Sequence, residues 1–301
     1  MTDATGPNRR AVLRLGLGLA GAGAMATAAA APVLAEGPQL RRTLALLETR
    51  AAVRLGVSAL DTGSGASVGY RADERFLLCS TAKALVVAAV LRRSETEPGL
   101  LDHVIDYGPS DVLAYAPVTS QHVADGMTVA ALCDAAITVS DNTAANLLVG
   151  LLGGPAAVTA FARSLGDDLT RIDRLEPDLN VTSPGDQRDT STPAQMAADL
   201  RALVLGDALN EASRQRLTDL LVANTTGGQT IRAGVPADWT VGDKTGSGAQ
   251  GESNDLAVVW PPRRAPLVIA VYVSPRDPAI AVEQAHRVIA EATRIVTGAL
   301  P

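Results

Sequence analysis

One stretch, residues 81–91, limits the folds open to this chain more than any other feature. It is almost entirely apolar, contains no Gly or Pro, and carries a single charge, Lys83. A helix that is apolar on nearly every side has to be buried in the core of a large protein. Lysine is almost never fully buried without a partner, and burial lowers its pKa toward a value at which the amine can act as a base.

Ser80 stands directly before this stretch and three residues before Lys83, so the two side chains are expected on one face, a helical turn apart. The start of a helix also favours a developing anion, because its first backbone N–H groups are unpaired. A hydroxyl, an amine within reach and such a helix end together indicate an activated nucleophile. The alternative is a serine that caps the helix and a lysine that extends to solvent, and the S-x-x-K spacing alone does not exclude it.

The other predicted elements fall into two groups, which indicates an α+β fold with two lobes. Strands are expected near both ends of the chain and helices in its middle, so the chain leaves a sheet, builds a helical domain and returns, with the site between the lobes. The expected domains are a sheet domain of residues 36–78 and 223–301 and a helical domain of residues 79–222. In chain order, the expected elements are a helix at 40–52, strands at 55–60 and 66–70, the helix at 81–91, helices at 128–139 and 141–152, one that ends at 166, one from 193, one that Asn210 caps and that runs to 222, strands at 239–244, 256–260 and 267–273, and a helix at 281–300.

The first 35 residues are predicted to be an export signal. Arg9 and Arg10 precede a Gly/Ala/Leu-rich stretch, and residues 33–35 supply small side chains at the cleavage positions. Because the stretch is weakly apolar, it resembles a twin-arginine signal more than a membrane anchor, which predicts export to the periplasm or the extracellular space. Residues 16–21 match the dinucleotide-binding pattern G-x-G-x-x-G, but no predicted strand precedes them.

Composition narrows the possible partners. The net charge is −6 and there is no basic run, so neither nucleic acid nor an anionic membrane surface is an expected partner. The three histidines are scattered and do not form a metal-ligand set, and we expect no cofactor. The two cysteines, Cys79 and Cys133, are interpreted as two thiols.

Three further motifs carry groups that can converge on Ser80. They are Ser140-Asp141-Asn142 between two helices, Glu176-Pro177-Asp178-Leu179-Asn180 in an irregular stretch at 166–192, and Lys244-Thr245-Gly246 at the end of a strand. Each has a structural explanation as well, respectively a helix cap, a solvated acidic loop and an edge-strand lysine. An irregular stretch of this length is uncommon and usually functional, and Pro177 restricts the backbone of Glu176.

In this order, the four motifs resemble those of the class A serine β-lactamases, with further similarity at residues 71–76 and 189–193 and coverage of about residues 40–300. The resemblance implies a five-stranded antiparallel sheet flanked by helices, next to an all-α domain. It also implies hydrolysis of the β-lactam ring of penicillins or cephalosporins by a monomer without a metal or cofactor. The alternatives are a D-Ala-D-Ala carboxypeptidase or transpeptidase, and a non-enzymatic β-lactam sensor.

The resemblance further implies a role for each motif residue. Ser80 is the nucleophile, Lys83 and Glu176 share the role of base, Ser140 relays a proton to the ring nitrogen, and Glu176 activates the deacylating water. Backbone N–H groups of Ser80 and Ser247 form an oxyanion hole. The remaining expected contributors are Asn142, Asn180, Lys244, Thr245, Ser247 and Tyr115, which bind substrate, and Arg174 and Asp189, which anchor the loop.

Two departures from the family pattern stand out. Members often bring one more arginine to the substrate carboxylate, and the candidates here are Arg232 and Arg287, between which the sequence does not choose. Thr230 occupies one of the usual positions of that arginine. Many members also carry a disulfide from a position that is Val87 here to one like Cys133, so that bridge is not expected.

Overall fold

We describe residues 38–277 and 279–301 in a computed structural model. The predicted export signal, with Arg9, Arg10 and the G-x-G-x-x-G match, lies outside the described residues, so its prediction stands untested.

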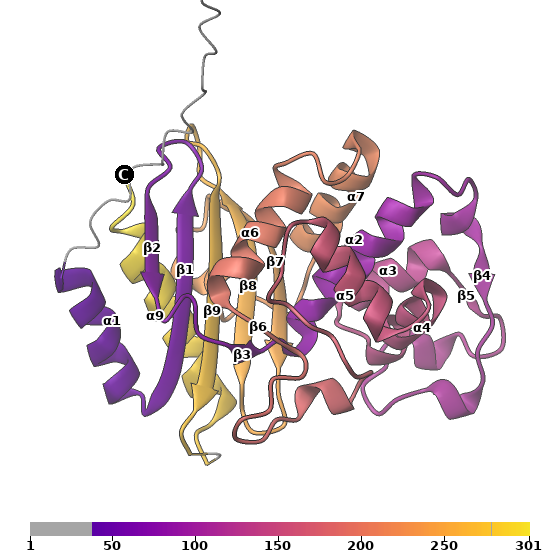
Figure 1. Cartoon of the computed structure of the whole chain (residues 1–301), viewed down its shortest axis with the longest axis horizontal. Coiled ribbons are helices and arrows are strands. Elements are labelled where there is room, and N and C mark those ends of the chain that lie inside the picture. Colours follow the sequence, from indigo (N-terminus) through magenta and orange to yellow (C-terminus); the bar gives the residue numbers. More distant parts are fainter. Residues whose placement is uncertain (1–37, 278) are drawn as a thin grey trace, which may run out of the picture. The chain divides into compact units, whose positions relative to one another are not determined.

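The centre of the described fold is a five-stranded antiparallel sheet with strand order β2-β1-β9-β8-β7 (Figure 1). The hairpin of β1 and β2 therefore pairs with β9, the last strand in the described part of the chain. The antiparallel five-stranded sheet is confirmed. Its strands are β1 (Val53–Asp61), β2 (Ser67–Tyr70), β7 (Thr240–Ser247), β8 (Ser253–Trp260) and β9 (Leu267–Pro275).

Both faces of the sheet are covered, and alternation along β9 shows how. Leu267, Ile269 and Val271 face a cluster that also includes helices α1 (Pro38–Arg50) and α9 (Val282–Thr297). Val268 and Ala270 face the opposite cluster, which the helices between residues 82 and 222 build. Because successive side chains of a strand point to opposite faces, a strand buried on both sides reads as the continuous apolar run seen here.

The helix α2 (Ala82–Ser94) has ten buried residues and packs against α3, α4, α5 and α7. Figure 1 shows this group beside strand β7, at one edge of the sheet. The side chains of Thr128, Asp141, Thr192 and Asn210 each accept a backbone N–H at a helix start. Thr128 and Asn210 were predicted as helix caps, whereas Ser140 was the cap considered for the helix that Asp141 caps. The helices concerned are α3 (Val129–Thr138), α4 (Asn142–Leu152), α6 (Pro193–Val204) and α7 (Glu211–Val222), while α5 spans Pro155–Ser164.

The structure corrects several boundaries. Strand β7 continues to Ser247, so Lys244 lies inside the strand rather than near its end. The sequence reading also missed a short helix, α8 (Ile231–Gly234), and two pairs of two-residue strands. The latter are β3 (Phe76–Leu77) with β6 (Thr190–Ser191) and β4 (Val104–Ile105) with β5 (Met127–Thr128). Two residues are too few to show a periodicity.

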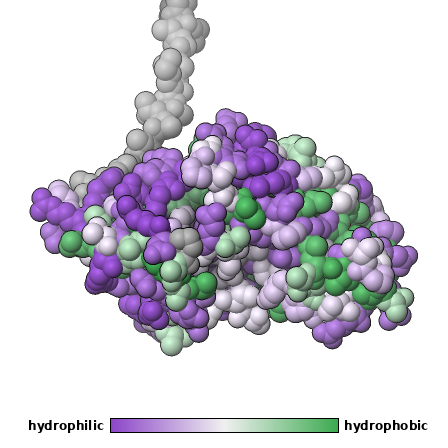
Figure 2. All heavy atoms as spheres, turned by 90° about the horizontal axis from the view of Figure 1, so that it is seen from below, coloured by the Kyte–Doolittle hydropathy of each residue, from purple (hydrophilic) through white to green (hydrophobic). Residues whose placement is uncertain are grey.

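No single helix within the described part of the chain is long and apolar enough to cross a membrane, although the bent pair α4 and α5 passes the same test of length and composition. On the face that Figure 2 shows, hydrophobic residues form small groups separated by hydrophilic ones. Scattered apolar residues of this kind are normal on a protein surface. The predicted domain limits and the monomeric state stay predictions.

Candidate active site

Ser80 lies in a 3₁₀ turn, Cys79–Thr81, that leads directly into α2. Strand β7 runs close beside this turn. A Cβ placed on Gly246 would lie 3.1 Å from the Ser80 nitrogen and 3.0 Å from the Cys79 Cβ, so a larger residue would push the strand and the turn apart. Cys79 has a φ of +48°, a conformation that non-glycine residues rarely adopt and that is often found at functional sites.

Lys83 occupies the first turn of α2, and its ammonium group is buried among acceptors. Its Nζ lies 3.1 Å from Glu176 Oε1, and it donates to the Ser140 carbonyl at 2.7 Å and to Asn142 Oδ1 at 2.6 Å. Burial lowers the pKa of Lys83, although the neighbouring Glu176 carboxylate opposes that shift. The predicted buried lysine near Ser80 is therefore present, and it has the partner that burial requires.

Glu176 reaches Ser80 from the long loop. The Ser80 hydroxyl donates to Glu176 Oε1 at 3.3 Å, and the Asn180 amide donates to the other carboxylate oxygen. Asn146 on α4 holds the backbone of Glu176 on both sides, with a 2.9 Å bond to its carbonyl and another 2.9 Å bond from its N–H. The sequence reading missed Asn146. Its signal is a polar residue four positions after Asn142 on a mostly apolar helix.

Ser140 stands between two lysines. Its hydroxyl oxygen accepts from Lys244 at 3.0 Å and from Lys83 at 3.3 Å. Its φ is +60°, another rare conformation for a residue with a side chain. The next residue, Asp141, is fully buried and accepts from the backbone of Val118, Thr119 and Ala144, which fixes the turn that presents Ser140.

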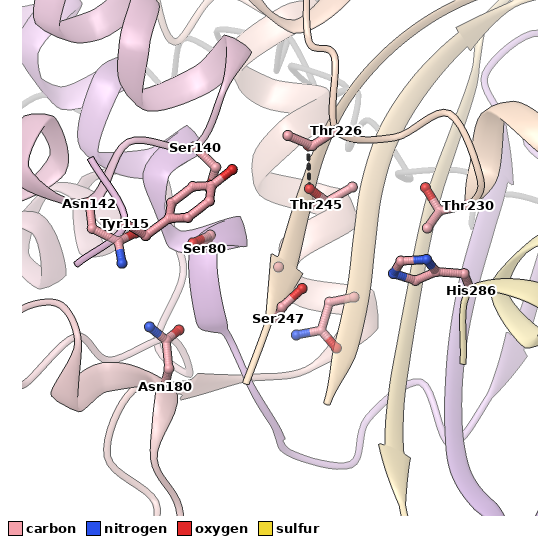
Figure 3. A pocket seen from close by; sticks show the side chains of 12 residues that line it. Ser80, Tyr115, Ser140, Asn142, Asn180, Thr226, Thr230, Thr245, Ser247 and His286 are labelled. Carbon is pink, nitrogen blue, oxygen red and sulfur yellow. Dashed lines mark hydrogen bonds between the residues drawn. The ribbon is translucent and has the colours of Figure 1, made fainter. Parts of the chain in front are cut away.

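Lys244 is fully buried in β7, with its Nζ bonded to Ser140 Oγ and to the Thr245 carbonyl. Burial lowers its pKa to about 7, and the charge of Lys83 adds to this shift. The Thr245 hydroxyl shares a 2.5 Å hydrogen bond with that of Thr226 (Figure 3). The wall formed by β7 thus presents hydroxyl groups backed by a titratable ammonium.

An ion pair between Arg174 and Asp189 connects the two sides of the loop that carries Glu176. Arg174 Nε lies 2.5 Å from Asp189 Oδ2, and only 18% of the Arg174 side chain and 1% of the Asp189 side chain are exposed. The other oxygen of Asp189 accepts the N–H groups of Asp173 and Arg174. The structure therefore brings together the pair expected to anchor the loop.

Ser80, Ser140 and Asn180 line one cavity of about 290 Å³, while their partners Lys83, Glu176 and Lys244 are buried and do not line it. Figure 3 shows Ser80, Ser140, Asn142 and Tyr115 on one side, Thr245 and Ser247 on the strand opposite, and Asn180 below. Tyr115 is 52% exposed and stands at the rim. Lining residues that the sequence reading did not assign to the site are Thr226, Thr230, Asn254 and His286.

Neither candidate arginine lines this cavity. Arg232 is instead paired with the buried carboxylate of Asp243 at 2.6 Å and donates to the carbonyls of Leu221 and Val222. Arg287 lines surface depressions on the outer side of α9. Thr230 and His286 occupy the end of the cavity where an arginine was expected (Figure 3).

Cys79 and Cys133 are both buried and are free thiols. Burial raises the pKa of both, so neither thiol is activated as a nucleophile. Within residues 38–277 and 279–301 there is no group of three or more His, Cys, Asp or Glu side chains that could hold a metal ion.

Comparison with known proteins gives consistent matches. The model of the β-lactamase enzyme family matches residues 39–300. The chain is 56% identical to β-lactamase AST-1 of Nocardia asteroides over 254 residues, which are 84% of this chain and 81% of that protein. It is 49% identical to β-lactamase CTX-M-25 of Escherichia coli, over 89% of this chain and 91% of that protein. A solved class A β-lactamase from Mycobacterium abscessus has a TM-score of 0.84 at 56% identity, covering 86% of this chain and 98% of that one.

Proposed function

This chain belongs to the class A β-lactamases, and on that premise we propose that it opens the β-lactam ring through an ester on Ser80 that a water activated by Glu176 then hydrolyses. The observation that carries the proposal is the contact of one carboxylate oxygen, Glu176 Oε1, with both the Ser80 hydroxyl and the Lys83 ammonium. The other oxygen accepts from Asn180.

In the first step, Ser80 Oγ attacks the lactam carbonyl carbon while its proton passes to the Lys83–Glu176 pair. The lowered pKa of Lys83 supports a share of this role for its amine. We infer that the backbone N–H groups of Ser80 and Ser247 bind the developing oxyanion, and the close approach of Gly246 to the Ser80 nitrogen supports this inference. In other acyl-transfer enzymes such a donor contributes about 3–4 kcal/mol.

Ring opening requires a proton on the departing nitrogen. Ser140 is suited to deliver it, because its hydroxyl oxygen accepts from Lys244 and from Lys83, and its own proton is therefore free to point into the cavity. Either lysine can then restore the proton that Ser140 gives up.

The ester is removed by water. Glu176 is fixed from its backbone by Asn146 and at its carboxylate by Asn180, and a carboxylate held in this way can deprotonate a water that Asn180 helps to position. Hydrolysis releases the ring-opened acid and restores the Ser80 hydroxyl.

Substrate recognition uses further groups that line the cavity, together with Lys244, which is buried beside Ser140. Lys244, Thr245 and Ser247 on β7 are suited to an anionic carboxylate. The side-chain oxygen of Asn142 accepts a hydrogen bond from Lys83. Its NH₂ group is therefore left to bind the substrate's side-chain amide. Tyr115 provides an apolar wall at the rim.

We also infer export by the twin-arginine route, which Arg9 and Arg10 support, and action as a monomer.

Mass spectrometry of the intact protein, quenched within milliseconds of mixing with a penicillin, tests the acyl-enzyme. We expect a transient adduct with the mass of the whole substrate, located on the peptide that contains Ser80 and missing in Ser80→Ala. An adduct elsewhere, or turnover by Ser80→Ala at the wild-type rate, contradicts the proposal. Of the alternatives, a peptidase or sensor would hold the adduct on wild-type protein for hours.

A further inference from the structure

Two buried carboxyl groups face each other where the loop of residues 166–192 meets α6. Asp167 lies at the start of the loop and Asp199 lies on the helix that follows its end, and both are almost completely buried. Each has one carboxyl oxygen, Oδ2, that is buried and has no hydrogen-bond partner. A buried polar atom of this kind is costly and requires an explanation.

The two carboxyl groups are within hydrogen-bonding range of each other. Two ionised carboxylates cannot bond, because both only accept and both carry negative charge. A single proton changes this, since it turns an oxygen of one carboxyl group into a donor to the other group. Carboxyl pairs that share one proton for this reason are well known in buried sites.

The surroundings decide which group holds the proton. Asp167 Oδ1 accepts the N–H groups of Leu169 at 2.7 Å and of Thr170 at 2.9 Å, and Arg163 Nη1 of α5 lies 3.9 Å from the same oxygen. These contacts favour a charged Asp167. Asp199 has only the Gln195 amide, at 2.9 Å on its own helix. The proton therefore belongs on Asp199.

Local electrostatics agree with this arrangement. Burial raises the pKa of Asp199 to about 8, and the charge of Asp167 adds to the shift. Burial also opposes the charge on Asp167, but its hydrogen bonds prevail and lower its pKa. Within the described residues, the other ionisable groups that act on the pair are Arg163 of α5 and Tyr272 of β9, and the Tyr272 hydroxyl is bonded to Thr81.

We propose that Asp199 donates a shared proton to Asp167 and thereby fastens the start of the Glu176 loop to helix α6, which makes Asp199 a positioning residue. A second contact ties the same region, because the Thr170 hydroxyl is bonded at 2.6 Å to that of Ser191 at the other end of the loop. The link to catalysis rests on the proposed role of Glu176, but the shared proton can be tested without it.

The pair makes loop closure depend on pH in a definite direction. When the loop start opens, water reaches Asp199, which then has the ordinary aspartate pKa of about 4. Between pH 4 and 8 the closed form thus holds one proton more than the open form. Closure is strongest at the acid end of this window and weakens as pH rises through 8, with an opening constant that grows about tenfold per pH unit below 8 and then levels.

The experiment measures amide hydrogen exchange of Leu169 and Thr170 in the full chain from pH 5 to 9, divided by the intrinsic exchange rates. In wild type this ratio should rise about tenfold per pH unit up to pH 8 and then level. Asp199→Asn should show a flat profile, because the NH₂ group of the asparagine donates to Asp167 at every pH. Asp168 is the exposed neighbour of Asp167, and Asp168→Asn is the matched control, which should follow wild type. A flat wild-type profile, or one that Asp199→Asn does not change, overturns the proposal.

A second measurement needs no variant that might fold poorly. Carbon-13 NMR of the aspartate carboxyl groups in wild type should show Asp199 titrating near pH 8. A wild-type midpoint near 4 overturns the shared proton. Because neither readout involves substrate, both stay valid if the role proposed for Glu176 proves wrong.

Discussion

The Lys83 ammonium and the Glu176 carboxylate lie 3.1 Å apart, and only 3% and 1% of these two side chains are exposed. A pair this deeply buried contributes little net stability, because desolvation of the two charges offsets their attraction. Loss of one partner is a different matter, since it leaves the other charged and unpaired. The pair is therefore better understood as a device for holding two proton acceptors beside Ser80.

That reading predicts the outcome of a double-mutant cycle. Lys83→Met should lower the free energy of unfolding by about 3–5 kcal/mol, because Glu176 is left buried without a cation. Adding Glu176→Gln should restore much of this loss while hydrolysis stays abolished. Urea unfolding at pH 7 of the four proteins measures it. Equal losses in the single and double variants would show that the two charges are not coupled.

Asp189 should be essential for holding the loop. Asp189→Asn weakens its bonds to Arg174 and removes a nearly buried charge pair, so we expect a loss of about 3–5 kcal/mol, seen chiefly as faster proteolysis between residues 166 and 192. The matched control is Asp186→Asn, which weakens a pair with the exposed Arg188 in the same loop and should leave proteolysis unchanged. Similar cleavage rates for the two variants would remove Asp189 from its anchoring role.

Lys244 should give the reaction an alkaline limit. Its pKa of about 7 means that the free enzyme offers a cation to a substrate carboxylate below pH 7 and loses it above. For a β-lactam with a free carboxylate, kcat/KM should therefore fall by up to tenfold per pH unit above 7, since this parameter reports ionisations of the free enzyme. The methyl ester of the same β-lactam is the control, and its kcat/KM should not fall in this way above pH 7. The same fall of kcat/KM above pH 7 with both substrates would assign the ionisation to another group.

Much of the fold could be predicted because local signals agree with it. Thr128 and Asn210 mark helix starts in the sequence and cap helices in the structure. The four motifs also converge as expected, because each combines reactive side chains with a recognisable turn or strand. Where a chain's local preferences and its tertiary contacts agree, sequence reasoning succeeds.

What escaped prediction depends on tertiary contacts alone. Asn146 differs in polarity from its mostly apolar helix, but its partner is seen only in the fold. The same holds for Asp199, whose contact with Asp167 turns it toward the loop of residues 166–192. Arg232 was a candidate for the substrate carboxylate, yet its partner is Asp243 on a strand eleven residues later. Burial and pairing of this kind leave no periodic trace in the sequence.

Export is predicted to depend on the arginine pair. Changing Arg9 and Arg10 together to lysine should retain the protein in the cytoplasm, because the twin-arginine route reads both side chains. Arg14→Lys, which alters a neighbouring arginine in the same segment, is the control and should not affect export. Immunoblots of cell fractions measure the distribution. Normal export of the double variant would point to a different secretion route.

The last prediction separates a hydrolase from an enzyme that only acylates. Glu176→Gln keeps the shape of the side chain, and its amide can still bond with Ser80 and Asn180, but it cannot take a proton from water. Lys83 remains as an alternative base for the first step. We therefore expect acylation of Ser80 to continue and release of product to slow by about 10²–10⁴-fold, the usual contribution of a general base.

Intact-protein mass spectrometry after mixing with a penicillin distinguishes the two steps. Wild type should show little adduct at steady state, and Glu176→Gln should show a persistent one. Asp178→Asn is a suitable control, because Asp178 belongs to the same 3₁₀ turn as Asn180 but lies outside the cavity lining, and this variant should behave as wild type. Were Glu176→Gln to turn over as fast as wild type, another group would have to activate the water. Were it to form no adduct, Glu176 would be needed for acylation, and Lys83 could not serve as the base without it.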